Sequence, residues 1–160
     1  MTEFRVGIGV DAHALVEGVR LVLAGVELDW PRGLAGHSDG DVLAHALVDA
    51  ILGAAGLGDI GELFPSGDPA WEGASSLFFL ERAYDAAKRA GWEIVNVDCI
   101  LVGEEPRIAP VREEMRARLA GALGVEPGRV TVRATTTDRL GFTGRGEGLA
   151  AQAVALLCRE

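Results

Sequence analysis

The chain has little cysteine and no excess of positive charge. Its two cysteines, Cys99 and Cys158, form no CxxC pair and no disulfide framework, so we expect ordinary thiols in a reducing compartment. The formal net charge of −9 argues against a nucleic-acid partner, because binding to phosphate backbones depends on Lys and Arg. No apolar run approaches the roughly 20 residues of a membrane-spanning helix, and the N-terminus lacks the basic and apolar stretches of a secretory signal. We therefore expect a soluble, cytoplasmic protein without membrane partners.

Length and composition indicate one domain whose apolar content is high for its size. The 160 residues are enough for one core and too few for two comfortable ones. Hydrophobic residues make up 49% of the chain, and the mean hydropathy is +0.22, which is apolar for a domain of this size. We expect part of this apolar surplus to be buried against other subunits.

Hydrophobic periodicity predicts strands alternating with helices. The predicted strands cover residues 4–10, 19–28 with a break at Gly25, 93–102 and 130–136. The predicted helices cover residues 39–56 with Ser38 as N-cap, 77–91 with Ser75 or Ser76 as cap, 108–123 closed by Gly124, and 149–157. This pattern predicts an α/β (two-layer α+β) single domain over residues 1–160, with a mixed sheet covered by helices. The long loop 65–74 has the composition of a mobile flap, with Trp71 as its anchor.

The three histidines all lie within the first 45 residues, among acidic residues. Asp11 and His13 are two positions apart at the end of the first predicted strand, so their side chains share a face. His45 lies on a predicted helix, on the same face as Asp41 and Asp49. If His45 meets Asp11 and His13, a Zn²⁺-like ion has three protein ligands and an open position, as in catalytic zinc sites.

The two further aspartates of that helix face allow two interpretations. Either Asp41 or Asp49 orients an imidazole from outside the ligand set. Alternatively, Asp41 and Asp39 simply favour the positive end of the helix dipole. The second interpretation does not explain His45.

A third cluster, residues 134–148, combines threonines, glycines and an acid. Hydroxyls and glycine backbone N–H groups bind phosphate oxygens, and a carboxylate such as that of Asp138 can hold Mg²⁺. The segment is not a P-loop, because it lacks the Gly-Lys-Ser/Thr ending. A Thr-rich strand followed by a tight glycine turn explains it equally well.

Taken together, these motifs resemble those of the 2-C-methyl-D-erythritol 2,4-cyclodiphosphate synthase family of non-mevalonate isoprenoid biosynthesis. The matching blocks span nearly the whole chain in order. They are Gly9-Val10-Asp11-Ala12-His13, residues 37–41 and 45–50, Leu57-Gly58-Asp59-Ile60-Gly61 with Phe64-Pro65, and residues 134–137 and 141–148.

The resemblance implies a lyase that closes a cyclic diphosphate. The 2-phosphate of 4-diphosphocytidyl-2-C-methyl-D-erythritol 2-phosphate attacks the β-phosphorus and expels CMP. One Zn²⁺ per subunit would be held by Asp11, His13 and His45, and Mg²⁺ or Mn²⁺ on the α- and β-phosphates would be held by Asp138. His37 and Thr136 would stabilise the transition state.

The resemblance also implies the binding residues. Ser38 would help hold phosphate, and the erythritol pocket would comprise Asp59, Ile60, Gly61, Phe64, Pro65, Ser66, Gly67 and Asp68. The cytidine pocket would comprise Gly103, Glu104, Glu105, Pro106, Arg107, Ile108 and Ala109, joined by the Thr135-Thr136 region, and Thr137 would be a further substrate-binding residue.

The family is homotrimeric, with active sites between adjacent subunits, which would account for the apolar surplus. Phe142, Arg145 and Glu147 would lie near the threefold axis, where related proteins hold an isoprenoid diphosphate. An ion pair between subunits, without ligand, is the alternative for Arg145 and Glu147.

Two positions depart from the family pattern. Asp138 stands where Glu is usual, and Ser66 stands where an acid is common, so second-metal binding and hydroxyl recognition stay open. A metal-dependent phosphohydrolase fits the His/Asp clusters alone, and a non-enzymatic trimer that binds isoprenoid diphosphate fits the apolar surplus and Arg145.

Overall fold

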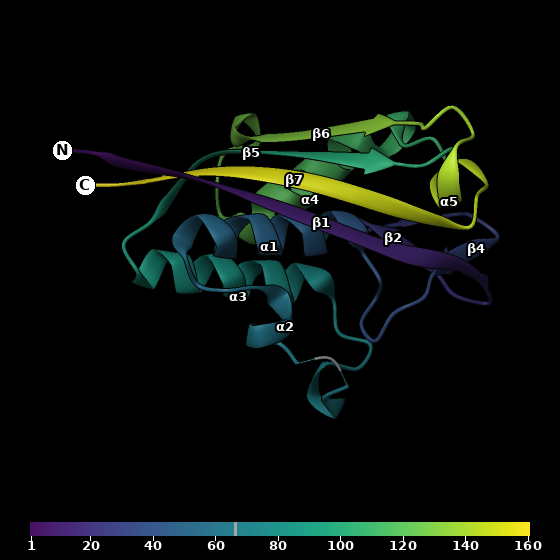
Figure 1. Ribbon diagram of the computed structural model, residues 1–160, viewed down its shortest axis with the longest axis horizontal. Coiled ribbons are helices and arrows are strands. Elements are labelled where there is room, and N and C mark those ends of the chain that lie inside the picture. Colours follow the sequence, from purple (N-terminus) through teal and green to yellow (C-terminus); the bar gives the residue numbers. More distant parts are fainter. Residues whose placement is uncertain (66) are drawn as a thin grey trace.

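The main sheet of the computed structural model, which describes residues 1–65 and 67–160, has the strand order β4-β1-β7-β5-β6. Figure 1 shows β1 (Glu3–Glu17) and β7 (Gly148–Arg159) side by side along the length of the molecule. β7 pairs antiparallel with both β1 and β5 (Glu93–Val102), whereas β5 and β6 (Val130–Thr135) are parallel. The predicted mixed sheet is confirmed.

Short strands complete the β-structure near the end of β1. β4 (Arg32–Leu34) pairs with the last residues of β1. β2 (Leu21–Leu23) and β3 (Val26–Leu28) form a separate hairpin, and its turn has Gly25 at φ +76°. The predicted break at Gly25 is therefore confirmed, because glycine adopts this left-handed conformation without steric cost.

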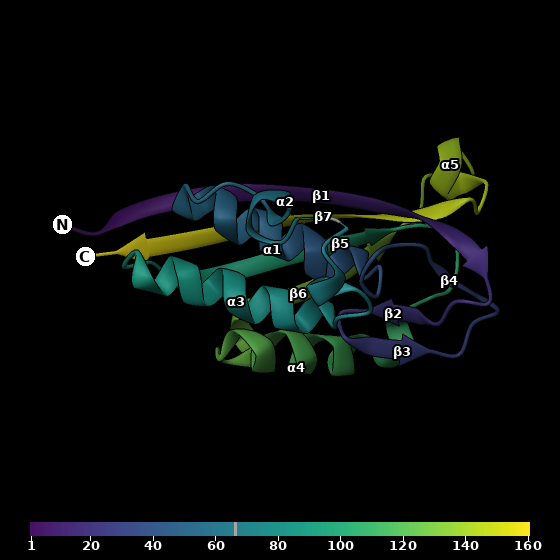
Figure 2. The same cartoon turned by 90° about the horizontal axis from the view of Figure 1, so that it is seen from below.

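Three long helices cover one side of the sheet (Figure 2). α1 (Val42–Ala55) packs against β1, β7 and β5, α3 (Ser76–Arg89) against α1, and α4 (Arg112–Leu123) against β6 and α3. The short elements are α2 (Ile60–Leu63), α5 (Gly141–Gly144) and the 3-10 turns η1 (Pro69–Trp71), η2 (Ala109–Val111) and η3 (Pro127–Arg129). Within the described residues, no helix combines the length and apolar character that crossing a membrane requires.

The close contact between β1 and α1 depends on two glycines. A Cβ atom at Gly9 would lie 1.9 Å from the carbonyl oxygen of Ala46, and one at Gly7 would lie 2.0 Å from that of Ala50. The alternate residues of β1 point to the opposite face, as the two-residue period of a strand requires. There Phe4, Val6 and other apolar side chains are more than half exposed, which leaves an apolar stripe on the face without helices.

The predicted C-terminal helix is wrong, since residues 149–157 lie in β7. Ala151, Ala153 and Ala155 are buried at alternate positions, and β7 has paired neighbours on both sides. The intrinsic helix preference of an Ala/Leu-rich segment is a weak effect that sheet pairing and packing override. The small alanine side chains also allow α1 to lie close to the strand.

Several predicted boundaries also need correction. α1 begins at Val42 with Asp41 as its N-cap, so Ser38 is not the cap and Asp39 is not in the first turn. β1 continues to Glu17, which places Asp11 and His13 within the strand rather than at its end. The helix predicted from Ile108 starts as η2, and part of the predicted glycine turn is α5. The cap of α3 is Ser75, one of the two serines proposed for it.

Candidate metal centre and substrate pockets

Asp11, His13 and His45 form a cluster where β1 packs on α1. The Oδ2 atom of Asp11 lies 3.1 Å from Nε2 of His13 and 3.1 Å from Nδ1 of His45. Three ligand atoms, one from each residue, lie within 4.8 Å of one another. The structure therefore brings together the three residues that the sequence predicts as metal ligands.

The charge distribution of this cluster favours an anionic carboxylate. Burial alone would raise the pKa of Asp11, but the close imidazoles of His13 and His45 stabilise its negative charge and lower the pKa to about 2. The carboxylate of Asp11, 3.1 Å from Nε2, raises the pKa of His13, and burial only partly offsets this effect. Asp11 is thus ionised at neutral pH and available to a cation.

A divalent ion fits this cluster by its donor atoms and by one unsatisfied nitrogen. Among the described residues, Nε2 of His13 is one of two buried side-chain polar atoms without a hydrogen-bond partner, although Asp11 lies nearby. A nitrogen that faces a carboxylate at 3.1 Å without hydrogen-bond geometry is suited to share a cation with it. Two imidazoles and one carboxylate are a ligand set typical of catalytic zinc.

The hydrogen bonds of Asp41 and Asp49 go to backbone N–H groups and not to an imidazole. Asp41 is fully buried and accepts hydrogen bonds from the backbone N–H groups of Ala24, Gly25 and Ala44, so it caps α1 and holds the β2–β3 turn. Asp49 accepts a hydrogen bond of 2.8 Å from the N–H of Ile60. The structure places Ser76 beside His45 instead, with 2.7 Å between Oγ and Nε2. Sequence spacing gave no signal for this contact, because Ser76 lies on another helix.

A pocket of about 210 Å³ opens beside the metal cluster. Its lining joins the three proposed ligands to His37, Ser38, Ile60, Gly61, Phe64, Pro65, Trp71 and Phe79. Trp71 packs edge-on against Phe64 at 5.3 Å between ring centroids, in agreement with its predicted role as an anchor of the loop.

The loop beside this pocket is held by contacts between side chains and backbone groups. Nε2 of His37 lies 2.9 Å from the carbonyl oxygen of Asp68. The side chains of Asp59 and Asp68 cap α2 and η1 by accepting hydrogen bonds from Glu62 and Ala70. Of the predicted erythritol residues, Ile60, Gly61, Phe64 and Pro65 line this pocket, Asp59, Gly67 and Asp68 do not, and Ser66 lies outside the described residues.

A second pocket, of about 190 Å³, lies where β5 and β6 end. Its lining contains most of the predicted cytidine residues, namely Gly103, Glu104, Pro106, Arg107, Ile108, Ala109, Thr135 and Thr136. The carboxylate of Glu104 accepts hydrogen bonds from the N–H groups of Thr137 and Arg139. These bonds hold a tight loop in which Asp138 has φ +53°. Glu104 thus fixes the position of the proposed second-metal residue.

Arg145 and Glu147 are paired within one chain. Nε of Arg145 lies 2.7 Å from Oε1 of Glu147. The prediction placed this ion pair between two subunits, but the structure forms it within one. Arg145 also borders a cavity of about 450 Å³ that includes Arg32, Thr136 and Arg139. Phe142 is exposed on α5.

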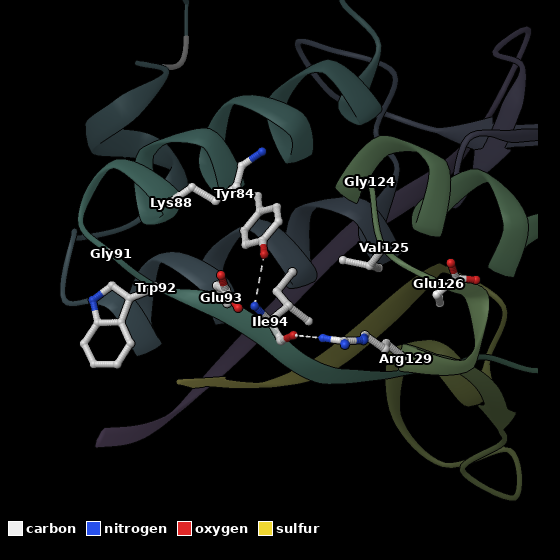
Figure 3. Close-up of a pocket in the computed structure, with 10 residues that line it drawn as sticks. All are labelled: Tyr84, Lys88, Gly91, Trp92, Glu93, Ile94, Gly124, Val125, Glu126 and Arg129. Carbon is white, nitrogen blue, oxygen red and sulfur yellow. Dashed lines mark hydrogen bonds between the residues drawn. The ribbon is translucent and has the colours of Figure 1, made fainter. Parts of the chain in front are cut away.

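A larger cavity, of about 600 Å³, lies between α3, the start of β5 and the segment that follows α4 (Figure 3). Two of its lining side chains bind the backbone of the same chain. Oη of Tyr84 accepts a hydrogen bond from the N–H of Ile94, and the guanidinium of Arg129 donates one to the carbonyl oxygen of Ile94. None of its lining residues is a histidine. We therefore assign the chemistry to the pocket beside the metal cluster rather than to this cavity.

The fold and the cluster define a class: an α+β protein with a candidate metal centre beside small-molecule pockets. Within that class, the chain belongs to the YgbB family, whose model matches residues 4–158. It is 55% identical to the 2-C-methyl-D-erythritol 2,4-cyclodiphosphate synthase of Moorella thermoacetica, over 96% of this chain and 94% of that protein. The predicted family is confirmed.

Solved structures agree with this assignment. The bifunctional IspDF from Campylobacter jejuni matches all of this chain with a TM-score of 0.96 at 43% identity, and the chain spans 43% of that protein. IspF of Plasmodium falciparum, solved as a CDP complex, matches with a TM-score of 0.86 at 31% identity over 98% of this chain and 97% of that one. The predicted fold class is confirmed.

Proposed function

We propose that this protein converts 4-diphosphocytidyl-2-C-methyl-D-erythritol 2-phosphate into 2-C-methyl-D-erythritol 2,4-cyclodiphosphate and CMP. The observation that carries the proposal is the Asp11/His13/His45 cluster, set beside a pocket in a member of this family. The predicted lyase activity in non-mevalonate isoprenoid biosynthesis is confirmed by the shared name of the relatives. We further propose one catalytic domain over residues 1–160 and a cytoplasmic location.

The reaction needs positioning and charge stabilisation more than a protein nucleophile. An oxygen of the substrate's 2-phosphate bonds to the β-phosphorus, while the bond from that phosphorus to the bridging oxygen breaks and CMP leaves with the electron pair. In phosphoryl transfer of this kind, most of the rate enhancement comes from alignment and from stabilising charge on the phosphate oxygens.

Asp11, His13 and His45 would hold Zn²⁺, and Asp138 would hold Mg²⁺ or Mn²⁺. These ions would supply positive charge to the diphosphate, which an acidic protein cannot otherwise bind easily. We assign to His37 and Thr136 the stabilisation of charge on the transferring phosphate.

The two described pockets match the two ends of the substrate. The pocket beside the metal cluster would take the erythritol phosphate, with Ser38 near the phosphate and Asp59 and Gly61 near the hydroxyls. The pocket lined by Gly103, Arg107 and their neighbours would take the cytidine. The CDP complex of the Plasmodium falciparum relative supports a cytidine nucleotide as part of the substrate.

A homotrimer with sites between subunits would bring these two pockets together. Within one chain the two pockets share no lining residue, although one substrate must span them. The exposed apolar stripe on β1, which includes Val6 and Ile8, supports burial of this sheet face against other subunits. Light scattering should give the mass of a trimer; a stable monomer that retains full activity would contradict intersubunit sites.

Two interpretations remain for the residues proposed to lie near the trimer axis: contact with an isoprenoid diphosphate, or an ion pair without ligand. Phe142 is exposed, as a contact to an axial isoprenoid diphosphate requires. Arg145, however, already pairs with Glu147 of the same chain, which supports an ion pair without ligand but within one subunit and not between two.

Replacing Asp138 by asparagine should lower kcat/KM by about 10²-fold, because the side chain loses the charge that binds the second cation. Zinc content should not change. Asp138→Glu, which restores the residue usual in the family, should keep activity and serve as the matched control. Activity at increasing Mg²⁺ concentrations measures both effects, and full activity of Asp138→Asn would contradict the assignment.

Zinc affinity should fall as the pH is lowered through the raised pKa of His13. The metal binds the neutral imidazole, so below that pKa a proton must leave before the ion can bind. The affinity should therefore decrease about tenfold per pH unit for each proton displaced. Competition with a zinc-binding dye between neutral and acid pH measures this change, and an affinity independent of pH would argue against a histidine ligand.

Release of CMP tests the proposed function. The purified protein with Mg²⁺ should release CMP from the cytidyl substrate, lose this activity with a strong chelator, and regain it with Zn²⁺. Absence of turnover after the metals are restored would contradict an enzymatic role and favour a binding protein.

A further inference from the structure

The second ring nitrogen of His45 faces a buried serine. While Nδ1 points to Asp11, Nε2 lies 2.7 Å from Oγ of Ser76 and 3.1 Å from Oγ of Ser38. Ser76 is fully buried, at the start of α3. The shorter of these two contacts thus belongs to a serine without exposure to solvent.

Ser76 is itself held by Asp39. One oxygen of Asp39 accepts the N–H of Ser76 at 2.9 Å, and the other accepts its hydroxyl proton as well as the N–H of Asp41. A carboxylate accepts hydrogen bonds and donates none when it is ionised. The hydroxyl proton of Ser76 therefore belongs to Asp39, and the lone pairs of Oγ remain for His45.

This arrangement determines which nitrogen of His45 carries the proton. With its own proton donated to Asp39, Ser76 can only accept from His45, so in the neutral imidazole Nε2 carries the proton and Nδ1 keeps its lone pair. That lone pair then faces the carboxylate of Asp11 at 3.1 Å. Two acceptors at this distance repel each other unless a proton or a metal ion lies between them.

We propose that Ser76 and Asp39 are positioning residues that hold His45 with Nδ1 ready for a divalent metal. The inference rests on the metal site of the proposed function. It assigns to Asp39, through Ser76, the role that the sequence had suggested for Asp41 or Asp49. Partners of this kind outside the ligand set fix the tautomer and orientation of a histidine and change metal affinity.

A purely structural role at the start of α3 does not account for these contacts. The N-cap of α3 is the neighbouring residue, Ser75, whose side chain accepts from the N–H of Leu77. Ser76 makes its side-chain bonds across to Asp39 and His45. Of the two adjacent serines, Ser75 therefore caps the helix, and Ser76 positions His45.

The test compares Zn²⁺ affinity, measured by competition with a chelating dye, in the wild type, Ser76→Ala and Ser75→Ala. Ser76→Ala should bind Zn²⁺ about tenfold to a hundredfold more weakly, whereas Ser75→Ala should lower the melting temperature without changing the affinity. Equal affinity of Ser76→Ala and the wild type overturns the inference, as does an equal loss in Ser75→Ala.

Nitrogen NMR of His45 in the zinc-loaded wild type needs no variant. It should show the proton on Nε2, and a proton on Nδ1 overturns the inference even if Ser76→Ala fails to fold. If the wild type binds no Zn²⁺, the assignment of the metal site is wrong, and the inference that rests on it is overturned as well.

Discussion

Replacing His45 by alanine is expected to lower kcat/KM by at least about 10³-fold, because the loss of one of three ligands removes metal charge that contributes several kcal/mol to stabilising the transition state. Zinc content should fall in parallel. The fold should survive, since His45, with its side chain 12% exposed, lies at the metal cluster and not in the hydrophobic core, and alanine is a good helix former. Steady-state kinetics together with metal analysis of the purified variant measure both effects.

The matched control for this variant is Asp49→Asn, one turn further along α1. In the structure Asp49 binds the N–H of Ile60, and asparagine can still accept that bond. We expect zinc content to be retained in Asp49→Asn. Wild-type turnover by a zinc-free His45→Ala protein would contradict the metal assignment.

Replacing Gly9 by alanine is expected to destabilise the protein by about 3 kcal/mol or more. The new Cβ atom would lie 1.9 Å from the carbonyl oxygen of Ala46, a backbone atom that cannot move without shifting α1 against β1. For a chain of this length, such a loss corresponds to a melting temperature lower by roughly 6–12 °C. Urea unfolding at fixed protein concentration measures the change, because association also affects apparent stability.

Gly53→Ala, on α1, provides the comparison for Gly9→Ala. A Cβ atom at Gly53 would meet its nearest neighbour, the carbonyl oxygen of Ile8, at 3.9 Å, an ordinary contact. Because alanine favours a helix over glycine, this variant should be more stable by up to about 1 kcal/mol. If both variants unfold like the wild type, the close approach of β1 to α1 is not required for the fold.

The fold was predictable where local pattern and tertiary context agree. The near-continuous apolar run of β5 and the glycine after α4 predicted boundaries that the structure confirms. The pattern failed at β7, where alanines that favour a helix occupy a central strand because α1 needs small neighbours there. It also failed at Ser38, since the turn that Asp41 stabilises delays the start of α1.

The candidate site was predictable in its ligands but not in their supports. Asp11, His13 and His45 stand out because histidine and aspartate are uncommon together on apolar elements, and the strand and helix periods fix their directions. The contact of Ser76 with His45 depends on how α3 packs against α1, which no local spacing records. Likewise, the hydrogen bonds that Glu104 accepts from the N–H groups beside Asp138 join two strand ends that lie far apart in the sequence.

Phosphorus NMR of the reaction products tests the central claim most directly. The purified protein, with its cytidyl substrate and Mg²⁺, should produce CMP and a cyclic diphosphate without consuming water, and a strong chelator should prevent both signals from appearing. Linear phosphate products would contradict the cyclisation and identify a metal-dependent phosphohydrolase instead.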